Sequence, residues 1–166
     1  EERISKILSL AVPLLEAIQL LHDNGVIHRD IKPSNIMVEE NGECKLMDLG
    51  IAKTIYGGNF SKTIGFIGTM QYAAPELIVG TNQVSSADYR VDIYALGVTL
   101  YELITGFNPF DAPTQAETMI KQAREELPAV NTIPRNLLEI LRKATAKDRA
   151  KRYQSASHFK DALLDF

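Results

Sequence analysis

The sequence has little cysteine and no basic excess, and both absences narrow the range of functions that it can have. Its 166 residues contain one cysteine, Cys44, which cannot form an internal disulfide and has no neighbouring Cys or His to complete a metal knuckle. The net charge is −3, so no basic surplus favours binding to nucleic acid or to an anionic membrane. We find no signal peptide and no apolar run long enough to cross a bilayer. The composition therefore favours a globular protein of the reducing cytoplasm.

The chain also has no initiator methionine. It begins at Glu1-Glu2 and enters an amphipathic pattern at once, which predicts an internal piece of a longer protein. The length suits one domain that buries roughly 70% of the surface exposed by the unfolded chain, so we expect a sizeable core.

Apolar spacing predicts a long first helix. Apolar residues recur at helical intervals over residues 4–21, and the Asn24-Gly25 pair that follows is a typical helix stop. Pro13 lies inside this pattern, so it either kinks the helix or marks a second start.

A β-hairpin and a long loop follow this helix. Residues 36–38 and 44–47 have the pattern of two short strands, and Asn41-Gly42 between them is a strong turn signal. Residues 48–73 have no sustained period and are rich in glycine, which predicts a loop. Loops of this length are usually functional or disordered.

The second half of the chain is predicted to be helical. Residues 91–105 are apolar nearly all round, which is typical of a buried helix. Further helix starts are marked by capping residues, namely Thr114 with Glu117, Pro134, and either Ser155 or Ser157. The fold class is therefore α+β, mainly α, with one small hairpin and one long loop.

The residues that carry chemistry lie in the run 28–35, His-Arg-Asp-Ile-Lys-Pro-Ser-Asn, and at Asp48 after the hairpin. Phosphoryl transfer needs in-line positioning, metal ions that neutralise phosphate charge, and an acceptor for the hydroxyl proton. The Asp30 carboxylate can orient that hydroxyl, and Lys32 can stabilise charge on the moving phosphate. Asn35 and Asp48 offer oxygen ligands of the kind that Mg²⁺ prefers, and the hairpin folds the chain back so that they can meet.

Residues 28–35 resemble the catalytic loop of protein kinases, and Asp48-Leu49-Gly50 resembles their metal-binding triplet. Other kinase-like segments follow in order, namely a substrate-positioning loop at 68–72, a closing motif at 74–76, the start of a central helix at 92–97, and Arg152. Lys32 two residues after Asp30 is the serine/threonine pattern. Residues 1–166 therefore resemble the C-terminal lobe of a eukaryotic-like (Hanks-type) Ser/Thr protein kinase.

The resemblance implies that the γ-phosphate of ATP is transferred, with Mg²⁺, to Ser or Thr hydroxyls of a protein substrate. The residues that it implies in catalysis are Asp30, Lys32, Asn35 and Thr69. Those implied in ATP binding are Lys32, Asn35, Met37 and Asp48, with Asn35 and Asp48 as metal ligands. Those implied in the structure are His28, Glu76, Asp92 and Arg152, the last paired with Glu76.

Two departures from the family pattern leave the resemblance intact. Leu49 stands where the triplet usually has phenylalanine, and its apolar side chain is large enough to preserve the packing. A short insertion lies between Glu76 and Asp92, which predicts a surface loop. Taken singly, several of these residue types have plainer explanations, because His28 alone predicts a packed side chain, Asp92 alone a helix cap, and Met37 a core position.

Regulation by phosphate is a further implication of the resemblance. Thr63, with Ser61 second, is the predicted phosphorylation site in the long loop. Arg29 and Lys53 are predicted to bind that phosphate, since a phosphate adds charge that arginine can pair with.

The sequence has no Gly-x-Gly-x-x-Gly loop, and no strand lysine with a partner glutamate precedes residue 28. Those parts bind the phosphates of ATP in protein kinases, and the adenine-binding hinge is absent as well. We therefore expect the N-terminal lobe to lie outside this chain and the isolated chain to bind ATP weakly and to be inactive. The absence of that lobe would leave apolar surface of this chain exposed, and such surface favours dimers or aggregates.

Two other function classes compete with an active kinase. A pseudokinase lobe that serves as a docking module is disfavoured, because Asp30, Lys32, Asn35 and Asp48 are all present. A small-molecule phosphotransferase, such as an aminoglycoside kinase, is similar near the catalytic aspartate but has no substrate loop like residues 68–76.

Overall fold

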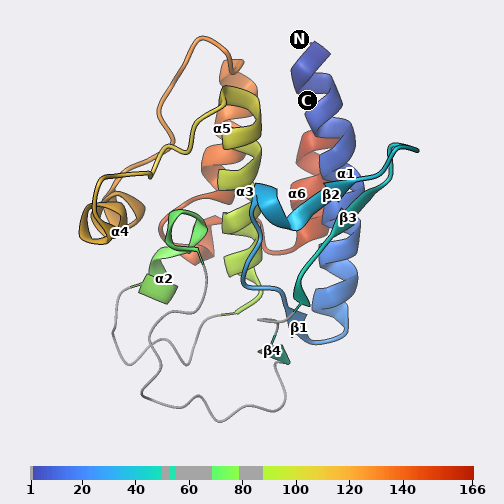
Figure 1. Cartoon of the computed structure of the whole chain (residues 1–166), viewed down its shortest axis with the longest axis horizontal. Coiled ribbons are helices and arrows are strands. Elements are labelled where there is room, and N and C mark those ends of the chain that lie inside the picture. The colour runs from blue at the N-terminus through green and yellow to red at the C-terminus, as the bar shows by residue number, and fades with distance from the viewer. Residues whose placement is uncertain (1, 50–52, 55–68, 79–87) are drawn as a thin grey trace.

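The computed structural model describes residues 2–49, 53–54, 69–78 and 88–166, and consists mainly of helices packed side by side (Figure 1). In this part of the chain the helices are α1 (Glu2–Asp23), α2 (Pro75–Ile78), α3 (Arg90–Thr105), α4 (Gln115–Arg124), α5 (Arg135–Ala144) and α6 (Ala156–Leu164). The strands are β1 (Val26–Ile27), β2 (Ile36–Val38), β3 (Cys44–Leu46) and β4 (Lys53–Thr54). The predicted fold class, mainly helical with a small hairpin, is confirmed.

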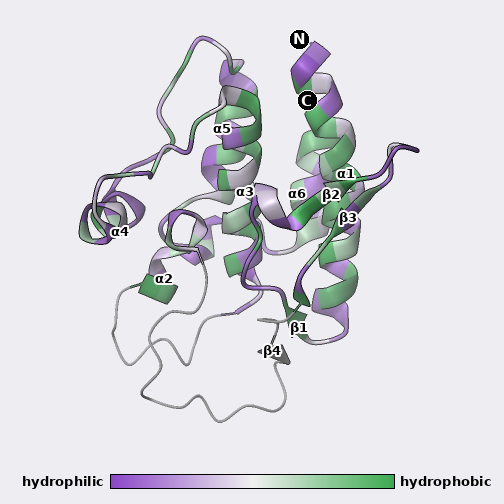
Figure 2. Ribbon diagram, in the orientation of Figure 1, coloured by the Kyte–Doolittle hydropathy of each residue, from purple (hydrophilic) through white to green (hydrophobic). Residues whose placement is uncertain are grey.

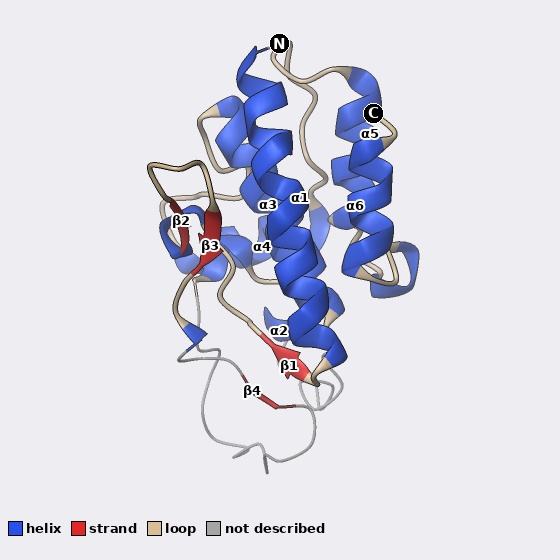
Figure 3. Cartoon of the chain, turned by 90° about the vertical axis from the view of Figure 1, so that its right-hand side faces the viewer, coloured by secondary structure: helices blue, strands red, loops and turns tan. Residues whose placement is uncertain are grey.

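Helix α1 buries one face and is continuous through its proline. Its buried residues are Ile7, Ala11, Leu14, Leu15 and Ile18. They pack against α6 and α3, with α6 beside α1 in the side view (Figure 3). Pro13 lies within the helix and marks no second start. The helix ends at Asp23, and Gly25 follows with a φ of +71°, which favours glycine.

Helix α1 is a longer apolar segment than the sequence analysis predicts. By length and composition, α1 is long and apolar enough to cross a membrane, so the statement that no run was long enough is wrong. In this structure the buried face of α1 packs against α6 and α3, whereas Leu20 on the same helix is 65% exposed.

The predicted hairpin is present and lies against α1. Strands β2 and β3 pair antiparallel with Ile36 opposite Leu46. Gly42 has a φ of +85°, and the backbone N–H of Glu43 donates to Asn41 Oδ1 at 2.9 Å, so the Asn-Gly pair forms the turn.

The short strand pair β1–β4 was not predicted. Val26 pairs with Thr54 and Ile27 with Lys53, and only β4 lies inside the region 48–73 that the sequence indicated as a loop. Two-residue strands are too short to show a period of alternation, which explains the omission. Most of that predicted loop lies outside the described residues.

Helix α3 forms the centre of the core. Of its 16 residues, 12 are buried, and Gly106 caps its C-terminus with a φ of +87°. Apolar residues colour much of α1 and α3, whereas α4 is largely hydrophilic (Figure 2). The apolar all-round pattern of residues 91–105 therefore predicted a buried helix correctly.

The predicted helix starts in the second half are also observed. Thr114 and Glu117 form the capping box of α4 in both directions. Pro134 is the N-cap of α5, and Ser155 rather than Ser157 caps α6, since it accepts the backbone N–H of His158 at 3.0 Å.

Candidate active site

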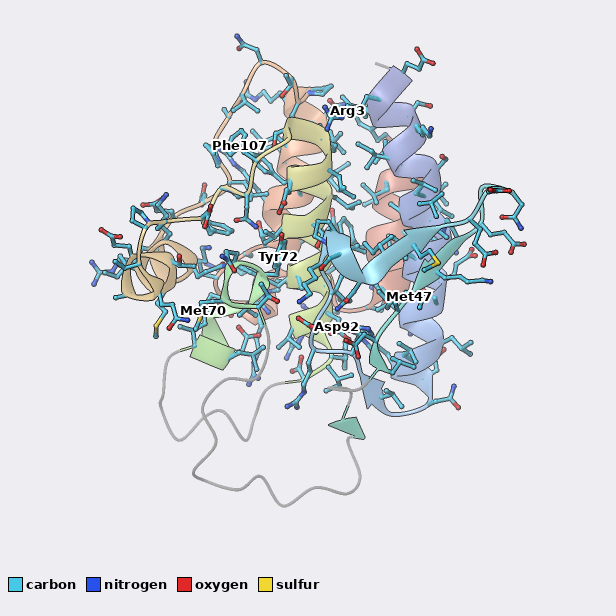
Figure 4. The ribbon with its side chains drawn as sticks, in the orientation of Figure 1. Arg3, Met47, Met70, Tyr72, Asp92 and Phe107 are labelled. Atoms are coloured by element: carbon cyan, nitrogen blue, oxygen red, sulfur yellow. The ribbon has the colours of Figure 1, made fainter. Side chains whose placement is uncertain are left out.

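The loop after β1 is held by a buried carboxylate at the start of α3. Asp92 Oδ2 accepts the backbone N–H of His28 at 2.9 Å, and Oδ1 accepts that of Arg29 at the same distance. Asp92 is fully buried, and it lies near the base of α3 in Figure 4. Arg29 has a φ of +68°, so these two bonds stabilise a turn that an unsupported arginine would rarely adopt. Asp92 therefore sets the backbone that leads into Asp30.

His28 is a packed, structural side chain. The backbone N–H of Asp30 donates to its Nδ1 at 3.2 Å, so Nδ1 is the acceptor and Nε2 carries the proton. Nε2 lies 2.9 Å from the carbonyl of Met47, to which it donates. With the ring fully buried, His28 ties the loop to the end of β3 and has no nitrogen left for proton transfer.

Asp30, Lys32 and Thr69 form one hydrogen-bonded cluster. Lys32 Nζ lies 2.6 Å from Thr69 Oγ1 and 3.3 Å from Asp30 Oδ2. Thr69 Oγ1 donates to Asp30 Oδ1 at 3.3 Å. The cluster joins residues almost forty positions apart, and the Lys32 side chain remains 23% exposed, so solvent reaches its charged end.

Asn35 belongs to the same cluster and uses its amide nitrogen there. Nδ2 donates to the backbone carbonyl of Asp30 at 2.7 Å and to its Oδ2 at 3.1 Å. Asn35 ends a 3₁₀ turn that starts at Pro33, and the proline fits that first position because it needs no N–H partner. The amide oxygen is then the atom that Asn35 can offer to a cation.

The backbone at Asp48 lies close to the backbone of Asn35. The N–H of Met47 donates to the carbonyl of Asn35 at 2.7 Å, which extends the hairpin contact by one residue, and Asp48 follows directly. Asp48 is exposed and has a φ of +60°. The structure therefore brings Asp30, Asn35 and Asp48 to one end of the hairpin, with carboxylate and amide oxygens of the type that Mg²⁺ binds.

Apolar side chains are exposed on the same hairpin and after it. Met37 is 47% exposed, Met47 42% and Leu49 50%. The expected packing of Leu49 is thus made only in part by the described residues. Met37 is not a core residue, which leaves it available for the ATP contact that the resemblance implies.

The segment from Thr69 to Ile78 is anchored to the C-terminal part of the chain. Arg152 donates to both oxygens of Glu76, at 2.6 and 2.8 Å, which is the pairing that the resemblance implied. Arg152 is 2% exposed and its Nε also donates to the carbonyl of Ala146 at 2.7 Å. This bidentate ion pair holds α2 against the segment before α6.

Arg29 is partly buried beside Asp92. Burial lowers the pKa of its guanidinium, and the charge of Asp92 acts in the opposite direction. The predicted phosphorylation sites Thr63 and Ser61 lie outside the described residues. Lys53 is in β4, and its side chain is outside them as well. Phosphate recognition therefore stays a prediction.

His22 is a site residue that the sequence reasoning missed. Its Nε2 lies 2.8 Å from Asp92 Oδ2, and its side chain is 4% exposed. It therefore buttresses the carboxylate that positions His28 and Arg29. The available signal was a histidine in the last turn of an apolar helix, which is weak without the fold.

Comparison with known proteins agrees with this geometry. Residues 2–164 match the family described as the protein kinase domain. A probable serine/threonine-protein kinase of Clostridium perfringens is 37% identical over 153 residues, which is 90% of this chain and 22% of that protein. Two further relatives each match 90% of this chain. The serine/threonine-protein kinase PrkC of Bacillus subtilis is 35% identical, over 23% of its own length. The serine/threonine-protein kinase PknB of Mycobacterium tuberculosis is 37% identical, over 24% of its own length. The chain thus spans about a quarter of the length of these relatives.

Proposed function

Because this chain belongs to the protein kinase family, we propose that it is the C-terminal lobe of a serine/threonine kinase that transfers the γ-phosphate of ATP to a protein hydroxyl. The observation that carries the proposal is the cluster in which Lys32 Nζ contacts both Thr69 and Asp30. The bacterial relatives named above, which are called serine/threonine-protein kinases, support the choice of hydroxyl.

In the proposed reaction, Asp30 acts on the acceptor. Its carboxylate accepts a hydrogen bond from the Ser or Thr hydroxyl and orients the oxygen towards the γ-phosphorus. A bond forms between that oxygen and phosphorus as the bond to the β-phosphate oxygen breaks, which releases ADP. The hydroxyl proton passes to Asp30. Lys32, held at Asp30 and Thr69, stabilises the negative charge of the transferring group.

Asn35 and Asp48 are the proposed ligands of Mg²⁺. The residues fit the ion, because the amide oxygen of Asn35 and the carboxylate of Asp48 are hard oxygen donors on neighbouring stretches of backbone. The metal supplies neutralisation of phosphate charge when it is bound. Met37, exposed on β2, is the proposed contact for the adenine ring.

The rest of the ATP site is proposed to come from an N-terminal lobe outside this chain, since the sequence has no glycine-rich loop and no strand lysine before residue 28. We therefore expect the isolated chain to bind ATP weakly and to transfer no phosphate. The need for ATP favours a cytoplasmic location for this lobe. The protein substrate would lie along the segment from Thr69 to Glu76.

The proposal is tested with the complete protein, Mg²⁺, labelled ATP and a set of serine, threonine and tyrosine peptides. The wild type should label serine or threonine peptides, and Asp30→Asn should lower the rate about 10²–10⁴-fold, because an amide cannot accept the proton. Glu40→Gln is the matched control, since it removes a charge from the exposed hairpin turn.

Two results would contradict the proposal. One is a complete, folded wild-type protein that labels no peptide under any of these conditions. The other is an Asp30→Asn variant as active as Glu40→Gln.

A further inference from the structure

A fully buried glutamine of α4 holds the backbone of the proposed substrate loop. Gln122 Nε2 donates to the carbonyl of Gln71 at 2.5 Å and to that of Met70 at 3.3 Å. Its exposed fraction is 0% although α4 is a largely hydrophilic helix. Met70 and Tyr72 lie between α4 and α3 in Figure 4. The polar end of Gln122 therefore faces the loop.

A chain of donors orients this glutamine. Because its nitrogen donates to two carbonyls, its Oε1 must be the atom that accepts the hydroxyl of Tyr94 in α3. Lys147 Nζ donates in turn to that hydroxyl at 3.0 Å and lies 4.3 Å from the centre of the Phe110 ring. All bonds thus run in one direction, from the lysine through the tyrosine to the glutamine.

The same short segment is fixed at its two ends by other contacts. Thr69 Oγ1 is bound to Lys32 and Asp30, as described above. The hydroxyl of Tyr72 donates to Glu102 Oε2 at 2.7 Å. Gln122 acts between them on the main chain, and its contact is to carbonyl groups that any substitution in the loop would keep.

We propose that Gln122, oriented by Tyr94, is a positioning residue that holds segment 69–72 in the geometry needed to bind the peptide substrate. This inference rests on the proposed kinase function and assigns a positioning residue to its substrate-binding segment. Without the amide, the carbonyl of Gln71 loses this donor, whereas that of Met70 keeps the N–H of Ala73 at 3.1 Å. An unpaired carbonyl in a half-buried segment favours rearrangement towards water. The backbone next to Thr69 would then shift or fluctuate, and with it the surface against which a peptide lies.

The experiment compares the complete wild-type protein with Gln122→Met, whose side chain is unbranched and of similar size but cannot donate. The KM for a peptide substrate should rise about tenfold, the loss expected from about 1.4 kcal/mol of binding free energy, while the KM for ATP stays unchanged. Ile120→Ala is the control, because Ile120 is 54% exposed on the same helix.

Hydrogen exchange provides a readout that needs no phosphate transfer. In the wild type, the side-chain amide protons of Gln122 should exchange slowly, as buried donors do. In Gln122→Met, the backbone amides of Tyr72 and Ala73, which close the 3₁₀ turn onto Thr69 and Met70, should exchange faster while those of α3 are unchanged.

The outcomes separate the two proposals. Rapid exchange of the Gln122 side-chain amide in the wild type, a measurement that no folding defect can obscure, would overturn the positioning role. So would a folded Gln122→Met variant with wild-type peptide KM, or one in which the KM values for ATP and peptide rise together. A protein that labels no peptide but keeps the protected amide would overturn the kinase proposal, and with it the peptide-binding role, while leaving the anchoring of segment 69–72 by Gln122 in place.

Discussion

His22 and Asp92 show how much of this site depends on buried polar side chains outside the proposed catalytic loop, residues 28–35. Asp92 is fully buried and accepts two backbone N–H groups and the ring of His22. A carboxylate in an apolar core is costly unless such donors surround it. Its three bonds therefore both stabilise the carboxylate and fix the turn at His28 and Arg29. Nothing about an aspartate near a helix start distinguishes this role from ordinary capping.

At the scale of single residues, Lys147 is predicted to make the free energy of unfolding depend on pH. Burial, together with the positive charge of Arg152, lowers its pKa to about 8, although Glu125 and Glu126 act in the opposite direction. The pKa of a lysine in the unfolded chain is about 10.4. Between the folded and unfolded pKa values the unfolded chain binds more protons than the folded chain, so the free energy of unfolding rises with pH. Relative to Lys147→Met, the wild type should gain about 1 kcal/mol of unfolding free energy between about pH 7 and pH 9.5, after allowance for solvent screening.

The measurement is urea unfolding of both proteins followed by circular dichroism at each pH. The difference between wild type and variant isolates Lys147, because other titrating groups are common to both. Parallel pH curves would show that its pKa is not depressed.

At the scale of elements, the close approach of α3 and α5 depends on a missing side chain. A Cβ added at Gly97 would lie 2.8 Å from Thr145 Cγ2 and 3.0 Å from Ala144 Cβ. Real Cβ atoms essentially never show the first of these distances, and the Thr145 side chain is stiff at its first torsion. The two helices can pack at this distance only because position 97 carries no side chain.

Gly97→Ala should therefore lower the free energy of unfolding by about 1–2 kcal/mol. Overpacking costs about 1–3 kcal/mol, and the better helix propensity of alanine returns less than about 1 kcal/mol. Denaturant titration measures the change. Thr145→Ser deletes the clashing methyl but keeps the hydroxyl that bonds Leu141, so the double variant should recover part of the loss. A double variant no more stable than Gly97→Ala would place the strain elsewhere.

At the scale of the whole molecule, Arg152 connects parts that are distant in sequence. Its guanidinium binds Glu76 in α2, the carbonyl of Arg90 at the start of α3 at 3.3 Å, and the carbonyl of Lys147 at 3.2 Å. Few side chains can supply so many donors from one planar group. The segment that closes the proposed substrate loop is thereby fixed to the helical core.

Arg152→Lys is predicted to be strongly destabilising despite its conserved charge. A lysine cannot make the paired bonds to Glu76 and removes donors from three partly buried carbonyls, which costs about 3 kcal/mol. Hydrogen exchange should also accelerate in residues 70–78. Arg135→Lys, at an exposed position of α5, is the control and should change stability by less than about 0.5 kcal/mol. Equal effects of the two substitutions would contradict the connecting role.

Features that depend on neighbouring residues were readable from the sequence. The buried central helix, the Asn-Gly hairpin and the capping box of Thr114 and Glu117 are local patterns, because helix and turn formation depend on residues within a few positions. The kinase-like motifs were equally visible, and the structure gathers Asp30, Lys32, Asn35 and Thr69 into one cluster.

Features that depend on distant residues emerged only on folding. His22 meets Asp92, Gln122 meets the carbonyls of Met70 and Gln71, and β1 meets β4, in each case across a sequence separation that no local pattern records. Burial decides these contacts: a polar group enclosed in the core must find a partner, and the packing of helices determines which partner is within reach. The proposed catalytic residues are thus visible in the sequence, whereas the contacts that hold them in place are set by how the helices pack.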